Sequence, residues 1–377
     1  MLTSCERNSV KLGIDQLVAN DFAPLKGLRV GLFTNLSAVD SRLIPTYDLF
    51  RLSDAVQLVA LFSPEHGLAG AAADGVQVAS GIDIKSGVPI YSLYGESYRP
   101  TPAMLADVDI IVCDIQDIGV RYYTFLWTIT HILEACGEYG VRVMLLDRPN
   151  PLGNHMDGSG LEPEQASLVG RYPIPIQHGM TLGELVSMIN ALWNPTPAEL
   201  TIIPYEGEPT WKLFVPPSPN MPHLVTAQHY PGACLIEGTT LSEGRGTALP
   251  FEIVGAPGLD SWELATQLNA LDLPGVRFRP HQFQPTASKH TGQLCGGVQV
   301  HILDAQVYRP LLVWLHVIRQ MRPYFEWLPH FDRLIGDTST RQKLDAGISV
   351  DEITSEWVIF LDKFDAKRQP YLLYERH

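Results

Sequence analysis

Short apolar runs rich in strand-forming residues alternate with helical patterns over the first 150 residues of the chain. The runs predict strands at residues 28–34, 56–62, 88–93, 108–114 and 141–147. The run at 110–113 is apolar at every position, as in a central parallel strand that is buried on both faces. Apolar residues also recur at helical spacing between 124 and 139 and predict a helix there. This alternation predicts a Rossmann-like α/β fold, in which helices cover both faces of a parallel sheet.

The rest of the chain divides into two parts of different composition. Residues 150–255 are dense in Pro and Gly, and Thr181 with Glu184 forms a capping-box pair that predicts one helix. Long loops often carry binding residues, so we expect this part to form a cleft wall. Beyond Pro257, helical patterns at 261–271, 310–321 and 350–364, a Pro-punctuated segment at 274–285 and a strand pattern at 297–303 predict a smaller α+β domain. We therefore expect a Rossmann-like domain at 1–255 and a C-terminal domain at 256–377 that helps to form the cleft.

Composition narrows the classes of partner and the compartment. The net charge of −14 argues against nucleic acid, because nucleic-acid binders need a basic face. No apolar run is long enough to span a bilayer, so we expect no membrane partner, and residues 1–15 lack the apolar stretch of a secretory signal. The cysteines are odd in number and far apart, which favours reduced thiols in the cytoplasm. They are Cys5, Cys113, Cys136, Cys234 and Cys295, of which Cys113 is also a candidate nucleophile at a strand end.

Several familiar catalytic signatures are missing from the sequence. It contains no G-x-G-x-x-G after the first strand, no P-loop, no H-E-x-x-H and no G-x-S-x-G. These absences argue against a dinucleotide enzyme, a nucleotide hydrolase, a zincin and a serine hydrolase. The cysteine and histidine spacings do not match a structural zinc site either. We therefore expect neither a cofactor nor a bound metal.

Polar clusters follow the predicted strands, at residues 63–67, 114–124 and 147–151, and recur at 177–181, 218–222 and 237–247. In a doubly wound sheet such clusters converge at one edge, where ligands bind. Carboxylates, amides, arginines and aromatic rings together favour a polyhydroxyl ligand of neutral or mildly anionic character. Tyr122, Tyr123 or Trp127 could stack on a sugar face. The candidate binding residues are His66, Gln116, Asp117, Arg121, Tyr122, Asp147, Arg148, Asn150, His178, Asn220, Glu237 and Arg245.

Glycoside hydrolysis needs two carboxyl groups beside one bond, and Glu65 with Glu243 is the first candidate pair. Structural roles compete with this interpretation. Glu65 could cap a following helix, Glu243 could pair with Arg245, and Glu237 is an alternative catalytic residue. The aspartates Asp114, Asp117 and Asp147 could cap helices or hold loops, and Arg121 and Arg148 could pair with Asp117 and Asp147 instead of ligand.

Taken together, the polar motifs resemble a known family. In chain order they are FSPEHG, GVPIYSLYG, DIQDIGVRYYT, LDRPNP, PIQHGMTLGEL, SPNMP, YPGACLIEGTTLSEGRGTALPFE and YLLY, and the resemblance runs from about Gly27 to Tyr374. The set is similar to the exo-β-N-acetylmuramidase (NamZ-like) family. The resemblance implies a hexosaminidase-type glycosidase that releases terminal N-acetylmuramic acid from the non-reducing end of a peptidoglycan-derived saccharide or muropeptide.

The resemblance also implies a Rossmann-like catalytic domain joined to a smaller C-terminal domain, with Glu65 as the general acid. It does not fix the second catalytic group, so retention, inversion and assistance by the substrate's acetamido group stay open. The lactyl carboxylate of muramic acid gives Arg121, Arg148 or Arg245 a possible ligand. Well-known members are exported, whereas this sequence shows no signal. Either an export segment is missing from this sequence or the protein works on imported fragments as a cytoplasmic recycling enzyme, and the acidic charge and unpaired cysteines favour the second. Two alternatives are a sugar-binding protein that never cuts and a metal-dependent hydrolase using His66, His178 and nearby aspartates.

Overall fold

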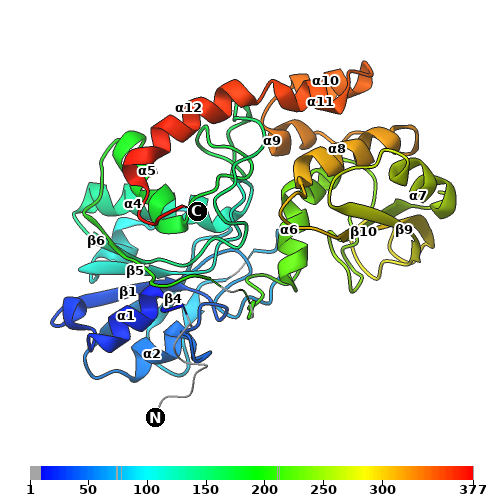
Figure 1. Ribbon diagram of the computed structural model, residues 1–377. Helices are drawn as coiled ribbons and strands as arrows, with labels where there is room; N and C mark the ends of the chain where they lie inside the picture. Colours follow the sequence, from blue (N-terminus) through cyan, green and yellow to red (C-terminus); the bar gives the residue numbers. More distant parts are fainter. Residues whose placement is uncertain (1–9, 74, 78, 210, 212, 377) are drawn as a thin grey trace, which may run out of the picture.

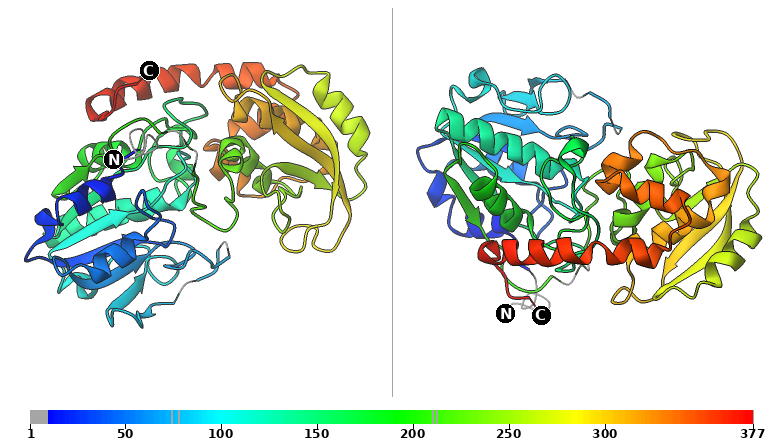
Figure 2. Two further views of the ribbon diagram at one scale, coloured as in Figure 1. Left: turned by 60° about the horizontal axis from the view of Figure 1, so that its bottom comes forward. Right: turned by 90° about the horizontal axis from the view of Figure 1, so that it is seen from above.

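The computed structural model describes residues 10–73, 75–77, 79–209, 211 and 213–376, so Cys5 lies outside the described residues. An α/β domain forms one half of the molecule and a smaller domain forms the other (Figure 1). A long C-terminal helix, α12, runs from the smaller domain back across the α/β domain, as both views of Figure 2 show. No helix of the described part has the length and hydrophobicity that spanning a bilayer requires.

Among the described residues, seven strands form the larger sheet, in the order β3-β4-β2-β1-β5-β6-β7. All neighbours pair in parallel except β3, which is antiparallel to β4. Counted without β3, the strands follow the order 3-2-1-4-5-6 of a Rossmann fold, and the order reverses between β1 and β5. The strands are β1 Arg29–Thr34, β2 Gln57–Ser63, β3 Gly81–Ile82, β4 Pro89–Ser92, β5 Ile110–Asp114, β6 Arg142–Leu146 and β7 Leu200–Ile203.

Helices pack on both faces of this sheet, because its central strands are apolar on both sides. On one face, α1 (Gly13–Ala19) and α2 (Thr46–Leu52) bury Ile14 and Phe50 against Leu32. On the other face, α4 (Thr124–Tyr139) and α5 (Leu182–Leu192) pack against the alternate strand positions, including Phe33 and Ile111. A short helix, α3 (Pro102–Leu105), precedes β5. The predicted Rossmann-like sheet is therefore confirmed.

Local signals in the sequence set the bounds of these elements. The predicted helix at 124–139 coincides with α4, which ends at Gly140 in the left-handed conformation that glycine adopts at low cost. The predicted capping box begins α5: the Thr181 hydroxyl accepts from the Glu184 backbone N–H at 3.2 Å, and the Glu184 carboxylate accepts from the Thr181 N–H at 2.9 Å. Glu184 is thus a cap.

The second domain contains a three-stranded antiparallel sheet in the order β8-β10-β9, which confirms the predicted smaller α+β unit. Its strands are β8 Ile253–Ala256, β9 Val276–Phe283 and β10 Cys295–Ile302, and its helices are α6 Leu224–Ala233, α7 Ser261–Asn269, α8 Pro310–Gln320, α9 Phe331–Ile335, α10 Ser339–Asp345 and α11 Val350–Ser355. The predicted helix at 350–364 is two helices, α11 and α12 (Val358–Arg368). The division of the chain at residue 256 stays a prediction.

The C-terminal segment 369–376 packs on the α/β domain. The Tyr374 hydroxyl donates to Asp147 Oδ2 at 2.7 Å, and the Tyr374 ring stacks on Tyr205 with centroids 4.0 Å apart. At the end of α12, Arg368 donates to the Gly179 carbonyl oxygen at 2.7 Å. Residues far apart in the sequence thus complete the same domain.

Candidate active site

A cavity of about 150 Å³ lies at the carboxyl edge of the larger sheet. Residues from three strand ends line it: Glu65 and His66 follow β2, Tyr94 follows β4, and residues 122–125 follow β5. This is the edge at which ligands bind in open α/β sheets. The remaining lining residues come from the long loops and from the second domain, namely Leu168, Val169, Ser218, Asn220, Met221, Tyr230, Glu237, Arg245 and Phe251. The cavity therefore lies where the two domains meet.

Glu65 is fixed in this cavity by hydrogen bonds from separate segments. The Thr124 hydroxyl donates to Oε2 at 2.7 Å, and the Gly75 backbone N–H donates to Oε1 at 3.2 Å. Tyr94 faces the same carboxyl group: burial, and then the charge and hydrogen bond of Glu65, raise the pKa of the Tyr94 hydroxyl. Only 9% of Glu65 is exposed. These contacts hold one carboxyl group in a defined orientation toward the cavity.

The turn that carries Glu65 explains its position. His66 and Gly67 both have positive φ values, 69° and 75°, and the Gly67 N–H donates to the Pro64 carbonyl oxygen at 3.0 Å. His66 Nδ1 lies 2.7 Å from the Ala72 carbonyl oxygen, which anchors the turn to the following loop. Among the described residues that follow β2, no helix begins before α3, so Glu65 is not a helix cap.

The structure places Glu237, and not Glu243, in the wall of the cavity. Glu243 is 2% exposed and does not line the cavity; its Oε2 lies 3.0 Å from Lys289 Nζ and its Oε1 lies 3.4 Å from Arg245 Nε. Glu237, in the 3₁₀ helix η4 (Cys234–Gly238), does line the cavity, and its side chain is 25% exposed. Burial and the nearby charge of Glu243 raise the pKa of Glu237 to about 8, while Lys289 acts in the opposite direction. Glu237 is thus the second carboxyl group of the cavity.

Of the three candidate arginines, only Arg245 reaches the cavity. Its Nη2 lies 2.6 Å from Glu237 Oε1, and its guanidinium stacks over the Phe251 ring at 4.9 Å. Arg148 is buried and forms a bidentate pair with Asp114, at 2.6 and 2.8 Å. This pair occupies Nε and Nη2 of Arg148, which are the donors that a ligand carboxylate would need.

Arg121 is fully buried and donates to five backbone carbonyl oxygens at 2.8–3.0 Å. It therefore holds loops together, and the structure places neither Arg121 nor Arg148 in the wall of the cavity. Their predicted pairing with Asp117 and Asp147 is wrong, because the observed partners are carbonyl oxygens and Asp114. The carbonyl partners of Arg121 belong to Ser159, Gly160, Ile174, Leu334 and Ile335.

The remaining candidates support the loops around the cavity. Asp147 accepts hydrogen bonds from Thr181 and Tyr374, and Asp117 accepts one from the Gly119 N–H. The side chains of Gln116 and Asn150 donate to backbone carbonyl oxygens, and buried His178 lies 3.7 Å from Asp117. Trp127 is fully buried, and its indole N–H donates to the Arg121 carbonyl oxygen, so it cannot stack on a sugar. Tyr122 does line the cavity, with its hydroxyl bonded to the Pro231 carbonyl oxygen.

The candidate list missed several lining residues, including Tyr94, Thr124, Ser218 and Tyr230. Tyr94 and Thr124 lie in the quoted motifs that follow β4 and β5, so the strand-end rule could have found them. Tyr230 begins another quoted motif, but it lies within α6 and does not follow a strand. It reaches the cavity because α6 packs at the junction of the two domains, where the Tyr230 ring contacts Tyr122 at 5.7 Å.

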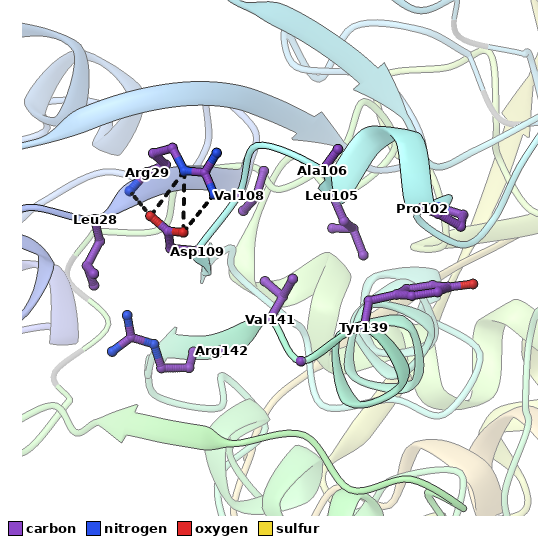
Figure 3. Close-up of a pocket in the computed structure, with 11 residues that line it drawn as sticks. Leu28, Arg29, Pro102, Leu105, Ala106, Val108, Asp109, Tyr139, Val141 and Arg142 are labelled. Atoms are coloured by element: carbon purple, nitrogen blue, oxygen red, sulfur yellow. Dashed lines mark hydrogen bonds and ion pairs between the residues drawn. The ribbon is translucent and has the colours of Figure 1, made fainter.

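A larger cavity, of about 600 Å³, lies at the opposite edge of the sheet, beside the start of β1, β5 and β6 (Figure 3). Arg29 is held there by Asp109, as the dashed lines show, and by Asp107. Tyr139 and Arg142 complete its rim. This edge carries the amino ends of the strands, where open α/β sheets do not bind their ligands. We therefore assign the candidate site to the smaller cavity.

Comparison with known proteins agrees with this geometry. Two family models match, "Exo-beta-N-acetylmuramidase NamZ, N-terminal" over residues 30–225 and "Exo-beta-N-acetylmuramidase NamZ, C-terminal" over residues 228–374. The chain belongs to the NamZ family. A curated member of that family, the peptidoglycan beta-N-acetylmuramidase NamZ of Bacillus subtilis (strain 168), is 44% identical over 98% of this chain and 93% of its own length.

Two solved structures, described as DUF1343 family proteins from Bacteroides fragilis NCTC 9343, share the fold. BF0371 superposes with a TM-score of 0.90 and BF0379 with 0.80; each is 33% identical and covers 98% of this chain and 100% of its own. The predicted family and the prediction of a glycosidase are thus confirmed, which favours an enzyme over a sugar-binding protein that never cuts. Within the described residues, no group of three or more His, Cys, Asp or Glu side chains is arranged to hold a metal ion.

Proposed function

We propose that this NamZ-family glycosidase is an exo-β-N-acetylmuramidase. Its substrate is a peptidoglycan-derived saccharide or muropeptide, from whose non-reducing end it releases terminal N-acetylmuramic acid. One observation carries the proposal: a single cavity at the carboxyl edge of the sheet brings together the carboxyl groups of Glu65 and Glu237, the guanidinium of Arg245 and several tyrosine rings. Two carboxyl groups beside one bond are what glycoside hydrolysis requires.

In this proposal Glu65 is the general acid that protonates the leaving oxygen. The hydrogen bonds from Thr124 and Gly75 hold its carboxyl group in place, so little reorganisation is needed when the proton is transferred. Glu237 replaces Glu243 as the second group. The distance between the two carboxyl groups in a substrate complex gives the stereochemical course, since about 5 Å accompanies retention and about 6.5–9.5 Å accompanies inversion.

Arg245 is the residue that we propose to select muramic acid. Its guanidinium lies on the cavity wall beside Glu237, where it can donate a charge-assisted hydrogen bond to the lactyl carboxylate. The Tyr122 and Tyr230 rings offer apolar faces to the sugar. Arg245→Ala should therefore lower the preference for muramic acid over glucosamine; an unchanged preference would contradict this role.

Two substrates separate the roles of the carboxyl groups. Loss of a general acid lowers the rate by about 100- to 10,000-fold, and less when the leaving group needs no proton. Glu65→Gln should therefore retain binding but lose turnover of an N-acetylmuramic acid–N-acetylglucosamine disaccharide, while it still cleaves the 4-nitrophenyl glycoside. Glu237→Gln should lose both. Exposed Glu199 provides the control Glu199→Gln, which should match the wild type. Near-normal turnover of the disaccharide by Glu65→Gln would refute the assignment.

We also propose that the enzyme works in the cytoplasm on imported fragments, as part of cell-wall recycling. The supporting observation is that Cys113, Cys136, Cys234 and Cys295 are all buried free thiols. Burial raises the pKa of Cys113 well above its usual value, which does not suit a nucleophile. Fractionation of cells that express the protein tests the location. Muramidase activity found only outside the cytoplasmic membrane would contradict it.

A further inference from the structure

A lysine of the second domain reaches the loop that carries Glu237. Lys289 lies in the connection between β9 and β10, and its Nζ donates to the carbonyl oxygens of Ile236 and Glu237 at 3.1 and 3.2 Å. The same Nζ lies 3.0 Å from Glu243 Oε2. An ammonium group has three donors, and each of them has an acceptor here. Lys289 is therefore held in one place by the segment 236–243.

The backbone around Lys289 packs closely on the same segment. The Thr286 N–H donates to the Gly246 carbonyl oxygen at 2.9 Å, and His290 Nε2 lies 2.8 Å from the Thr240 carbonyl oxygen. Gly246 has φ +76°, and a Cβ atom there would lie 2.4 Å from the Ala287 nitrogen, so only glycine fits. The position of Lys289 is thus fixed by the fold of both segments.

Four charged groups alternate in sign from the cavity inward. Glu237 Oε1 lies 2.6 Å from Arg245 Nη2, Arg245 Nε lies 3.4 Å from Glu243 Oε1, and Glu243 Oε2 lies 3.0 Å from Lys289 Nζ. The side chain of Glu243 is 2% exposed and that of Lys289 is 22% exposed. Solvent therefore screens the interaction between these two charges weakly. The ionisable groups that face Glu237 are Glu65, Tyr122, Tyr230, Cys234, Glu243, Arg245 and Lys289, and His330 contacts its carbonyl oxygen.

We propose that Lys289 is a positioning residue of the active site: it holds the segment 236–243 against the cavity and, together with Glu243, sets the charge beside Glu237. This inference rests on the proposed function of Glu237. The two charges act on Glu237 in opposite directions, since the anion of Glu243 disfavours a second anion and the cation of Lys289 favours it. Removal of one or the other should therefore shift the ionisation of Glu237 up or down.

Carbon-13 NMR of glutamate side chains measures this ionisation directly, and the signal of Glu237 is assigned by its loss in Glu237→Gln. We expect the titration midpoint of Glu237 to rise by about one pH unit in Lys289→Met and to fall by about one unit in Glu243→Gln. Lys289→Arg keeps the charge and should keep the midpoint. The pH dependence of kcat/KM has a limb that reports the ionisation of Glu237, and the midpoint of that limb should move in the same directions. A merely structural role would not give this result.

Midpoints that are equal in the wild type, Lys289→Met and Glu243→Gln would overturn the inference. If Lys289→Met fails to fold, Lys289→Gln decides, because it removes the charge but keeps a donor for the carbonyl oxygens: a higher midpoint supports the inference, and an unchanged one overturns it. The proposed function fails in a different way. If the wild type releases no N-acetylmuramic acid while the midpoints still shift, the muramidase proposal is wrong and the link between Lys289 and Glu237 stands.

Discussion

Replacement of Arg121 by alanine tests whether this residue supports the fold and not the substrate. The guanidinium is fully buried, and burial lowers its pKa to about 10, so it stays charged at neutral pH. Nη1 donates to three carbonyl oxygens in loops of the α/β domain, and Nη2 donates to two in α9 of the second domain. Arg121→Ala would leave all five acceptors without this donor.

The size of the effect follows from these contacts. Each buried carbonyl group left unpaired costs about 1–3 kcal/mol, which sets an upper range of about 5–15 kcal/mol for five. Water that enters the vacated space recovers much of this, and breaking a buried charged network typically costs about 3–5 kcal/mol. We therefore expect the free energy of unfolding to fall by about 4 kcal/mol. With an unfolding entropy of about 2.1 cal/mol/K per residue, this loss lowers Tm by about 5 °C for 377 residues.

Urea denaturation followed by circular dichroism measures the change in stability, and the disaccharide assay measures the preference for muramic acid. Arg277→Ala is the matched control, because Arg277 forms a surface pair with Asp272 and should change stability by less than about 1 kcal/mol. Arg121→Ala should retain the preference for muramic acid in the fraction that is folded. If Arg121→Ala has wild-type stability but loses this preference, the structural role is refuted and Arg121 contacts the substrate instead.

Two further predictions concern single hydroxyl groups. Thr124→Val removes the 2.7 Å donor to Glu65 and should lower kcat for the disaccharide about tenfold, with little change in KM; an unchanged kcat would show that this hydrogen bond does not orient the acid. Burial raises the pKa of Asp147 to about 6, so the Tyr374 hydroxyl donates to a carboxylate only above that pH. Because that bond lowers the pKa of Asp147, Tyr374→Phe should destabilise the protein more at pH 8 than at pH 5 in urea titrations, and equal losses would contradict this account.

The sheet could be predicted from sequence because its central strands are apolar on both faces. The expected strand at 28–34 begins one residue before β1 and ends with it. The expected strand at 56–62 begins and ends one residue before β2. β9 was missed because Pro280 interrupts its alternating pattern. Since β9 is an edge strand, it tolerates a proline that a central strand would exclude. β7 was missed because it is short and follows a Pro-rich loop.

The site was only partly predictable, for a different physical reason. The strand-end rule placed Glu65 correctly at the edge of the sheet, because that rule depends on topology alone. The choice between Glu237 and Glu243 depends on which face of one loop points to the cavity, and no periodic pattern encodes this. The acceptors of Arg121 and Arg148 lie 34 to 214 residues away along the chain, so the residues beside these arginines in sequence do not reveal them. Lys289 gave no signal because it lies in the connection between β9 and β10, 46 residues beyond Glu243.

The return of the C-terminal segment to the α/β domain sets an order of events during biosynthesis. Asp147 and its partner Tyr374 are 227 residues apart, so the ribosome releases the carboxylate long before its hydroxyl donor. At about 5–20 residues per second, the interval is about 10–45 s. During that time the nascent α/β domain has a carboxyl group at the end of β6 that lacks one of its native hydrogen bonds. The α/β domain therefore reaches its final state only after the second domain has been synthesised.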